Sequence, residues 1–247
     1  MKTLLSTFRA FAQGAVGVVF PRVCVHCGDA VEDAAELQHV CAACAPLVHI
    51  VHAPHCTTCG HPFFGKTSDR ECEHCELLVP RFGEGRTAIL LRGAGRALVH
   101  TLKYHQGLHV LRDVTALMRR APGYVDFLRG KVLVPVPLHP RKLRERGYNQ
   151  SLLLAECARD ACADAARIEE ILVRKIDTVS QTHFDRATRQ ENLKNAFALR
   201  KGAVINPGHH YLLIDDVFTT GSTLNACAAV LRDAGALNLD VVTFGHG

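Results

Sequence analysis

The sequence predicts an α/β fold, a mostly parallel sheet flanked by helices, preceded by a small cysteine-rich module. Three observations predict this. Eight of the eleven cysteines lie between Cys24 and Cys75, whereas long apolar runs alternate with helical patterns from about residue 86 onward. A hydrophobic content of 48% over 247 residues is enough for a sizeable core. We therefore expect a module over 21–80 and a larger domain over 86–247, joined at 80–85.

The segment 1–20 has a pattern of its own. Its apolar residues recur at helical spacing, which indicates an amphipathic helix that packs on the rest of the chain or on a partner. Arg9 and Gln13 interrupt the apolar run, so it is too short and too polar to span a membrane. A secretion signal and a helix on a membrane surface are the alternatives.

The cysteines form four Cys-x-x-Cys pairs. Each pair places two sulfurs on one side of a turn, and two pairs complete a tetrahedron around zinc. Sequential pairing gives two ligand sets: Cys24, Cys27, Cys41 and Cys44, then Cys56, Cys59, Cys72 and Cys75. The spacing also permits an interleaved pairing. Because four thiolates leave no open position, we predict two structural zinc ions.

Zinc binding alters the net charge of the chain and explains its high cysteine content. Two four-thiolate sites lower the formal charge of +5 to about +1, so the net charge does not by itself indicate nucleic-acid binding. The sequence shows no export signal, so this cysteine usage predicts a reducing cytoplasm and metal binding rather than disulfides.

The second region alternates strands and helices. The expected strands are Thr87–Leu91, Val132–Val136, Ile171–Arg174, Tyr211–Ile214 and Asp240–Phe244. The expected helices are Leu108–Arg120, Asn149–Ala165, Arg186–Ala196 and Ser222–Ala234. Continuous apolar strands indicate a parallel sheet covered on both faces, and ligands of such sheets bind beyond the carboxyl ends of the strands.

The loop after the strand Tyr211–Ile214 carries the strongest pattern for binding. Two carboxylates, Asp215 and Asp216, follow the strand and suit the hydroxyls of a sugar. Backbone N–H groups at the next helix start favour a phosphate, which Gly221 allows to approach closely. We infer a site for ribose 5-phosphate, against two alternatives: a helix N-cap, and aspartates that are solvated or bind a metal. Its residues are Asp215, Asp216, Thr219, Thr220, Gly221, Ser222 and Thr223.

A basic cluster follows the strand Val132–Val136. These cations suit a diphosphate or a nucleic-acid backbone, and Tyr148 could stack a base. A solvated basic face that opens the next helix is the alternative. Lys103 ends a helical pattern, where it either binds the same anion or complements the helix dipole. The candidates here are Lys103, Arg141, Arg144, Arg146 and Tyr148.

The segment Tyr211–Thr223, YLLIDDVFTTGST, resembles the signature of type I phosphoribosyltransferases, although Tyr211 and Phe218 are bulkier than usual. Together with the eight cysteines, it resembles the ComF family, and the resemblance covers nearly the whole chain. Further matching elements are LKYHQG (102–107), VPVPLHPRKLRERGYNQ (134–150), Gln181, Thr182, Arg189, Asn192 and 196–197. The resemblance implies a zinc-ribbon module joined to a phosphoribosyltransferase-like domain.

The family resemblance also implies ligands and partners. It implies phosphoribosyl diphosphate (PRPP) with Mg²⁺, and a flap over 178–189 in which Arg186 and Arg189 clamp phosphate; an ordinary surface loop is the alternative. Family members are linked to natural competence, which implies single-stranded DNA and a DNA-uptake ATPase or helicase as partners. Others are annotated only as amidophosphoribosyltransferase-like or gluconate-uptake proteins.

The sequence does not decide between two functions. One is a phosphoribosyltransferase, which transfers a pentosyl group. The other is a non-catalytic PRPP-liganded protein that binds single-stranded DNA or acts as an adaptor. Several transferases carry an acidic base where this chain has Thr219, and threonine is a poor base. We therefore predict binding and assign no catalytic residue.

Overall fold

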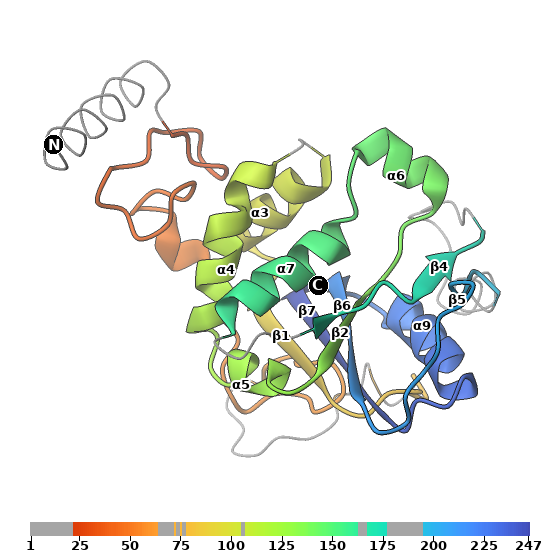
Figure 1. Ribbon diagram of the computed structural model, residues 1–247. Helices are drawn as coiled ribbons and strands as arrows, with labels where there is room; N and C mark the ends of the chain where they lie inside the picture. The colour runs from red at the N-terminus through yellow and green to blue at the C-terminus, as the bar shows by residue number, and fades with distance from the viewer. Residues whose placement is uncertain are drawn as a thin grey trace, which may run out of the picture.

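The computed structural model describes residues 22–63, 72, 75, 78–104, 107–162, 167–176 and 195–247. Within these residues, five strands form one sheet, and every neighbouring pair in it is parallel. In spatial order the strands are β1 (Gly85–Leu90), β7 (Asn238–His246), β6 (His210–Phe218), β2 (Val132–Pro135) and β3 (Arg167–Ile168) (Figure 1). The predicted parallel sheet is confirmed.

The central strand β6 shows why its sequence is continuously apolar. Residues 211–214 are fully buried. Leu212 and Ile214 pack into one hydrophobic core, whereas Tyr211 and Leu213 pack into a second. Successive side chains of a strand point to opposite faces, so a strand covered on both faces needs apolar residues at every position.

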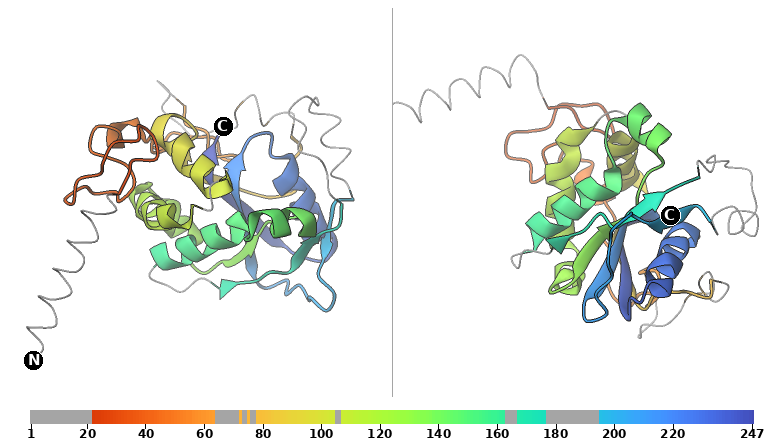
Figure 2. Two further views of the ribbon diagram at one scale, coloured as in Figure 1. Left: turned by 90° about the horizontal axis from the view of Figure 1, so that it is seen from above. Right: turned by 45° about the vertical axis from the view of Figure 1, so that its right-hand side comes forward.

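Helices cover both faces of the sheet (Figures 1 and 2). One face carries α3 (Gly93–Tyr104), α4 (Leu111–Arg120), α5 (Tyr124–Leu128) and α7 (Gln150–Ala161). The other carries α9 (Ser222–Asp233). A short helix, α6 (Pro140–Arg146), connects β2 to α7, and single 3₁₀ turns occupy η1 (Ala45–Leu47) and η2 (Leu108–Val110).

Some expected elements differ from the structure. The strand expected at 171–174 is β4 (Leu172–Arg174), which pairs antiparallel with β5 (Phe197–Leu199) in a separate sheet. It is therefore not a strand of the parallel sheet, whose edge is β3. The helix expected from Asn149 begins one residue later, because the Asn149 side chain is its N-cap and accepts a bond from the Ser151 amide. The helix expected over 1–20 lies outside the described residues, as do residues 186–194 of the helix expected at Arg186–Ala196; its last two residues, 195 and 196, form a turn.

The two halves of the cysteine-rich region pack on different faces of the sheet. Cys24, Cys41 and Cys44 belong to the core under α3 and α4, whereas Cys56, Cys59 and Cys75 belong to the core under α9. The segment between the halves runs along β1: Val51 N donates to Ala88 O, and Leu90 N donates to His49 O. The segment thereby covers the exposed edge of β1. The boundary at 80–85 remains a prediction.

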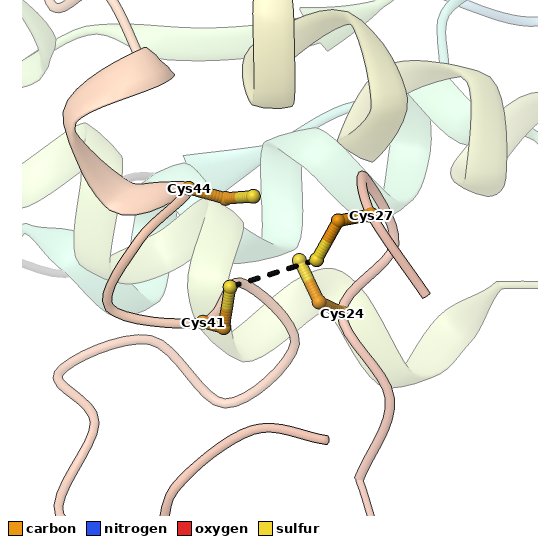
Figure 3. A group of neighbouring side chains, drawn as sticks. All are labelled: Cys24, Cys27, Cys41 and Cys44. Carbon is orange, nitrogen blue, oxygen red and sulfur yellow. Dashed lines mark hydrogen bonds between the residues drawn. The ribbon is translucent and has the colours of Figure 1, made fainter. Parts of the chain in front are cut away.

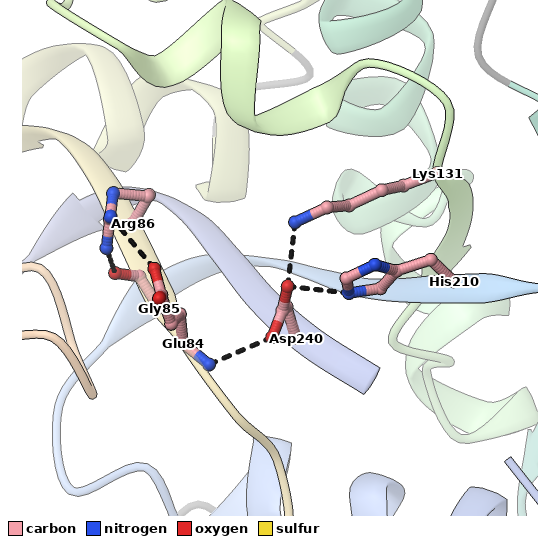
Figure 4. A network of polar contacts seen from close by, with 6 residues as sticks. All are labelled: Glu84, Gly85, Arg86, Lys131, His210 and Asp240. Atoms are coloured by element: carbon pink, nitrogen blue, oxygen red, sulfur yellow. Dashed lines mark hydrogen bonds and ion pairs between the residues drawn. The ribbon is translucent and has the colours of Figure 1, made fainter. Parts of the chain in front are cut away.

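A polar network ties the amino ends of the strands together (Figure 4). Oδ2 of Asp240 lies 2.7 Å from Lys131 Nζ and 2.7 Å from His210 Nε2, and its Oδ1 accepts from Glu84 N. Burial raises the pKa of Asp240, but the bonds from Lys131 and Glu84 and the nearby positive charge outweigh it, so that the pKa is lowered. The network lies at the opposite end of the sheet from the expected site.

Candidate functional site

The first cluster of cysteines forms two facing turns (Figure 3). Cys24 and Cys27 stand on one turn, closed by a bond from Gly28 N to Cys24 O. Cys41 and Cys44 stand on the other, closed by a bond from Cys44 N to Cys41 O. Gly28 has φ +85°, a left-handed conformation that glycine adopts without strain. Ligand atoms of all four cysteines lie within 4.8 Å of one another.

The second cluster repeats this arrangement with Cys56, Cys59, Cys72 and Cys75, whose sulfurs also lie within 4.8 Å of one another. Gly60 follows the first turn at φ +77°, and a Cβ there would lie 2.6 Å from the backbone nitrogen of Thr87. The turn therefore needs glycine both for its conformation and for its contact with β1.

The geometry of both clusters suits zinc. Four sulfurs at about 2.3 Å from a zinc ion are about 3.8 Å from one another. The sulfurs of Cys27 and Cys41 are 3.7 Å apart, and those of Cys59 and Cys72 are 3.8 Å apart. The sequential pairing is therefore confirmed. Since the ligands are four thiolates in each case, both sites are closed, structural zinc sites.

The loop between β6 and α9 has the shape expected of an anion site. Gly221 has φ +72° and stands at the N-cap position of α9, next to the helical amide groups. The hydroxyl oxygens of Thr220 and Ser222 are 3.0 Å apart. A pocket opens at this loop, lined by Asp215, Val217, Thr219, Thr220, Gly221, Ser222, Thr223 and Leu224. Six of the seven residues predicted for ribose 5-phosphate line this one pocket.

Asp216, the seventh residue, is not among the residues that line the pocket, and an ion pair holds its side chain. Its Oδ1 lies 3.0 Å from Nζ of Lys103, and the two side chains are 8% and 25% exposed. Its Oδ2 is buried and has no hydrogen-bond partner among the described residues. A buried carboxylate oxygen without a partner is rare in folded proteins, so it indicates an acceptor position for a group that the described residues do not supply.

Asp215 is held from the other side. Its Oδ1 accepts bonds of 2.9 Å from Ser151 Oγ, at the start of α7, and of 2.9 Å from Asp216 N. Burial and the charge of Asp216 raise the pKa of Asp215 to about 7, although these bonds and the positive charge of Lys103 act in the opposite direction. A buried carboxylate whose charge is disfavoured by a neighbouring carboxylate favours a cation, or hydroxyl donors, beside it.

Three of the predicted basic residues, Arg141, Arg144 and Arg146, stand on α6. Arg141 pairs with Glu145 at 3.1 Å, and Arg144 is exposed. The guanidinium of Arg146 donates to Oε1 of Gln150 and lies 5.9 Å from the centre of the Tyr104 ring. These residues form a basic rim beside the end of α3, from which Lys103 reaches Asp216.

The aromatic residue that the rim exposes differs from the predicted one. Tyr148 is partly buried against the core and donates its hydroxyl to the carbonyl of Leu102. Tyr104, in contrast, is 65% exposed; it lies within the element LKYHQG (102–107), but no role was predicted for it from the sequence. Ser151 was also missed, since a serine at a helix start is more often a cap than a ligand of a remote carboxylate. Arg186 and Arg189 lie outside the described residues.

Residues 15–76 match the family model described as "Double zinc ribbon domain". Fold and clusters together define the class: an α/β protein with an N-terminal double zinc ribbon. The relatives that match the chain over most of its length are competence and DNA utilization proteins, which supports its resemblance to the ComF family. In the part of the chain that the structure describes, no helix combines the length and apolar character needed to cross a membrane.

Three relatives represent the matches. Competence protein F of Haemophilus influenzae is 27% identical over 222 residues, which cover 88% of this chain and 94% of the relative. DNA utilization protein YhgH of Escherichia coli K12 is 29% identical, covering 75% and 81%. Competence protein ComFC of Bacillus subtilis 168 is 23% identical, covering 80% of each chain.

Proposed function

We propose that this protein binds PRPP with Mg²⁺ in the pocket between β6 and α9, and that it acts on DNA taken up in natural competence. The observation that carries the binding proposal is the lining of the pocket. A carboxylate, Asp215, and the complete hydroxyl- and glycine-rich loop 219–223 face the same space. Ribose hydroxyls and a 5-phosphate need these two kinds of groups side by side.

Different residues of the pocket would bind different parts of the ligand. The amides and hydroxyls of 219–223 would hold the 5-phosphate, while Asp215 and Asp216 would accept bonds from the ribose hydroxyls. Carboxylate oxygens are also the ligands that Mg²⁺ takes in proteins, and the ion would offset the charge of the diphosphate. Lys103 and Ser151 orient the two carboxylates.

The cellular role follows from the names of the relatives. Two of the three are competence proteins, and the third is a DNA utilization protein. By analogy, this protein would handle incoming single-stranded DNA in the cytoplasm, together with a DNA-uptake ATPase or helicase. The relatives' names carry this part of the proposal, while the geometry of the pocket carries the PRPP site.

Transfer of the ribose is a separate hypothesis. Thr219 is exposed at the pocket and is a poor base, whereas Asp215 is the pocket carboxylate whose pKa lies near neutrality. If the protein is a phosphoribosyltransferase, it releases diphosphate from PRPP when a base or amine acceptor is added. If a panel of such acceptors yields no diphosphate while PRPP still binds, the protein is a PRPP-liganded factor.

Binding of single-stranded DNA is a second candidate function, favoured by the rim of α6. Tyr104 is 65% exposed beside Arg146, an arrangement on which a base can stack next to a phosphate contact. We expect salt-sensitive binding of an oligonucleotide, weakened by Tyr104→Ala and by Arg144→Ala/Arg146→Ala. Arg112→Ala, an exposed arginine on α4, is the matched control. Unchanged affinity in both rim variants would exclude this surface.

Calorimetry with PRPP and Mg²⁺ tests the binding proposal. Asp215→Asn/Asp216→Asn should weaken binding roughly tenfold or more, because hydrogen bonds to charged groups contribute about 1.5–3 kcal/mol each. Asp126→Asn, an exposed aspartate on α5, should bind as the wild type does. Equal affinities of the wild type and the double variant would contradict the assignment of Asp215 and Asp216 as ligands of PRPP.

A further inference from the structure

The segment 78–82, which we name the strap, joins the second cysteine cluster to the α/β domain. Leu78 N donates to Cys75 O at 2.8 Å, and Cys75 N donates to Cys72 O at 2.8 Å. The strap therefore continues directly from the turn that carries two of the four zinc ligands. The side chain of Leu78 is 1% exposed, so the strap begins with an anchored residue.

Leu78 reaches the loop that we assign to the 5-phosphate. A Cβ placed on Gly221 would lie 2.8 Å from Cδ2 of Leu78 and 2.6 Å from Cζ of Phe218. The backbone of Gly221 thus rests directly on these two side chains, with no room for a methyl group between them. Phe218 of β6 and Leu78 of the strap therefore both pack against Gly221 and limit its movement.

Polar contacts fix the rest of the strap along α9. Arg81 N donates to Oδ1 of Asn225 at 2.6 Å, and Nδ2 of Asn225 donates to Val79 O at 3.3 Å. Arg232, one helix end away, donates from Nε to Arg81 O at 2.9 Å. Asn225 belongs to the first turn of α9, whose amides adjoin the phosphate loop. The strap thus contacts both the loop and the helix start.

The two zinc sites differ in this respect. Cys56, Cys59 and Cys75 share one hydrophobic core with Phe218 and the buried face of α9. The first site shares its core with α3 and α4 instead. A structural change at the second site can therefore reach Gly221 through side chains that pack against one another in this core. Among the described residues, no cysteine of the first site belongs to that core.

We propose that Leu78 is a positioning residue, through which the second zinc site holds the phosphate loop in its binding conformation. This inference rests on the proposed function for its ligand, but the packing of Leu78 on Gly221 does not. The coupling is reciprocal: PRPP bound at the loop makes zinc at the second site harder to remove, while the first site is unaffected.

The matched variants are Leu78→Ala and Leu37→Ala, two buried leucines at 1% and 2% exposure. Leu37 belongs to the hydrophobic core that contains Cys24, Cys41 and Cys44 of the first zinc site. Both substitutions remove the same atoms from a core. We expect Leu78→Ala to weaken binding of PRPP with Mg²⁺ by roughly tenfold, a typical coupling, while two zinc ions remain bound. Leu37→Ala should leave the affinity unchanged.

Hydrogen–deuterium exchange of the ligand-free protein supplies a readout that needs no PRPP. Leu78→Ala should speed exchange of the amides of 219–226, and Leu37→Ala should not. If the wild type fails to bind PRPP, the proposed function fails, yet exchange still decides the role of Leu78. Equal exchange in the wild type and Leu78→Ala would overturn the inference. Leu78→Val, a smaller change, replaces Leu78→Ala should the latter not fold.

Discussion

The ammonium group of Lys103, on α3, lies 3.0 Å from Oδ1 of Asp216, on β6, and both side chains are largely removed from solvent. This ion pair joins a helix of one face to the end of the central strand. Removing one partner of a buried pair leaves the other charge uncompensated, which costs far more than removing both. The pair therefore contributes to the stability of the fold and also holds the Asp216 side chain in place at the candidate site.

Lys103→Met should lower the free energy of unfolding by about 1–3 kcal/mol, less than for a fully buried pair because Lys103 is partly exposed. Urea denaturation measures the change. Lys103→Met/Asp216→Asn, in which no charge is left alone, should recover part of the loss. A single variant as stable as the wild type would show that solvent compensates Asp216.

The pKa of Asp215 predicts a pH dependence of stability. Its folded value of about 7 lies above the ordinary value of 3.8, so between these values the folded state binds more protons than the unfolded state. The contribution of this group to stability is therefore complete at low pH and is lost as pH rises through about 7.

Thermal melts of the ligand-free protein from about pH 5 to about pH 8 check this dependence. The wild type should lose about 1–2 kcal/mol more than Asp215→Asn over this range, a value below the full pKa equivalent because Asp215 is partly exposed. Parallel curves for the two proteins would mean that Asp215 is charged throughout.

The cysteine clusters predict a metal content of two zinc ions per chain. Cys44→Ser should lower the content to about one, since three thiolates hold zinc less well than four. Cys157→Ser, a buried cysteine outside both clusters, should keep both ions. Metal analysis of the purified proteins measures this directly, and a Cys44→Ser protein that retains both ions would contradict the ligand set.

Asp113 attaches the first half of the ribbon to α4. This carboxylate of α4 is 1% exposed and accepts bonds of 2.7 Å from the amides of Gln38 and His39. Asp113→Ala should destabilise the protein by about 2–3 kcal/mol, because two partly buried amides lose a charged acceptor. Its affinity for PRPP should not change.

Asp126→Ala is the control for Asp113→Ala, since Asp126 is exposed and pairs with Arg129 one helical turn away, a contact that contributes little. Its cost should remain below about 1 kcal/mol. Equal costs for the two variants, measured by denaturation, would show that Asp113 does not attach the ribbon.

Local patterns predicted much of the fold. Residues 211–214 are apolar at every position because two cores cover them, and a parallel strand leaves this signal in the sequence. Cysteine spacing likewise predicted the zinc ligands. The strand at 171–174 was placed in the wrong sheet, because an apolar run of three residues does not specify its neighbours.

The candidate site was predictable only where its residues are contiguous. Asp215 and 219–223 form one string, so their common pocket followed from the sequence. Lys103 contacts Asp216 and Ser151 contacts Asp215 from two other helices, and such contacts depend on the packing of α3 and α7 rather than on a motif. Tyr104 and Tyr148 are chemically alike, and only burial separates them.

The most direct test of the central claim is a competition measurement at the loop 219–223. PRPP bound in the presence of Mg²⁺ is titrated with ribose 5-phosphate, with ribose and with diphosphate, in the wild type and in Gly221→Ala. The account predicts displacement by ribose 5-phosphate, little displacement by ribose, and loss of binding in Gly221→Ala, whose methyl group would meet Phe218 and Leu78. Displacement by diphosphate but not by ribose 5-phosphate would contradict it.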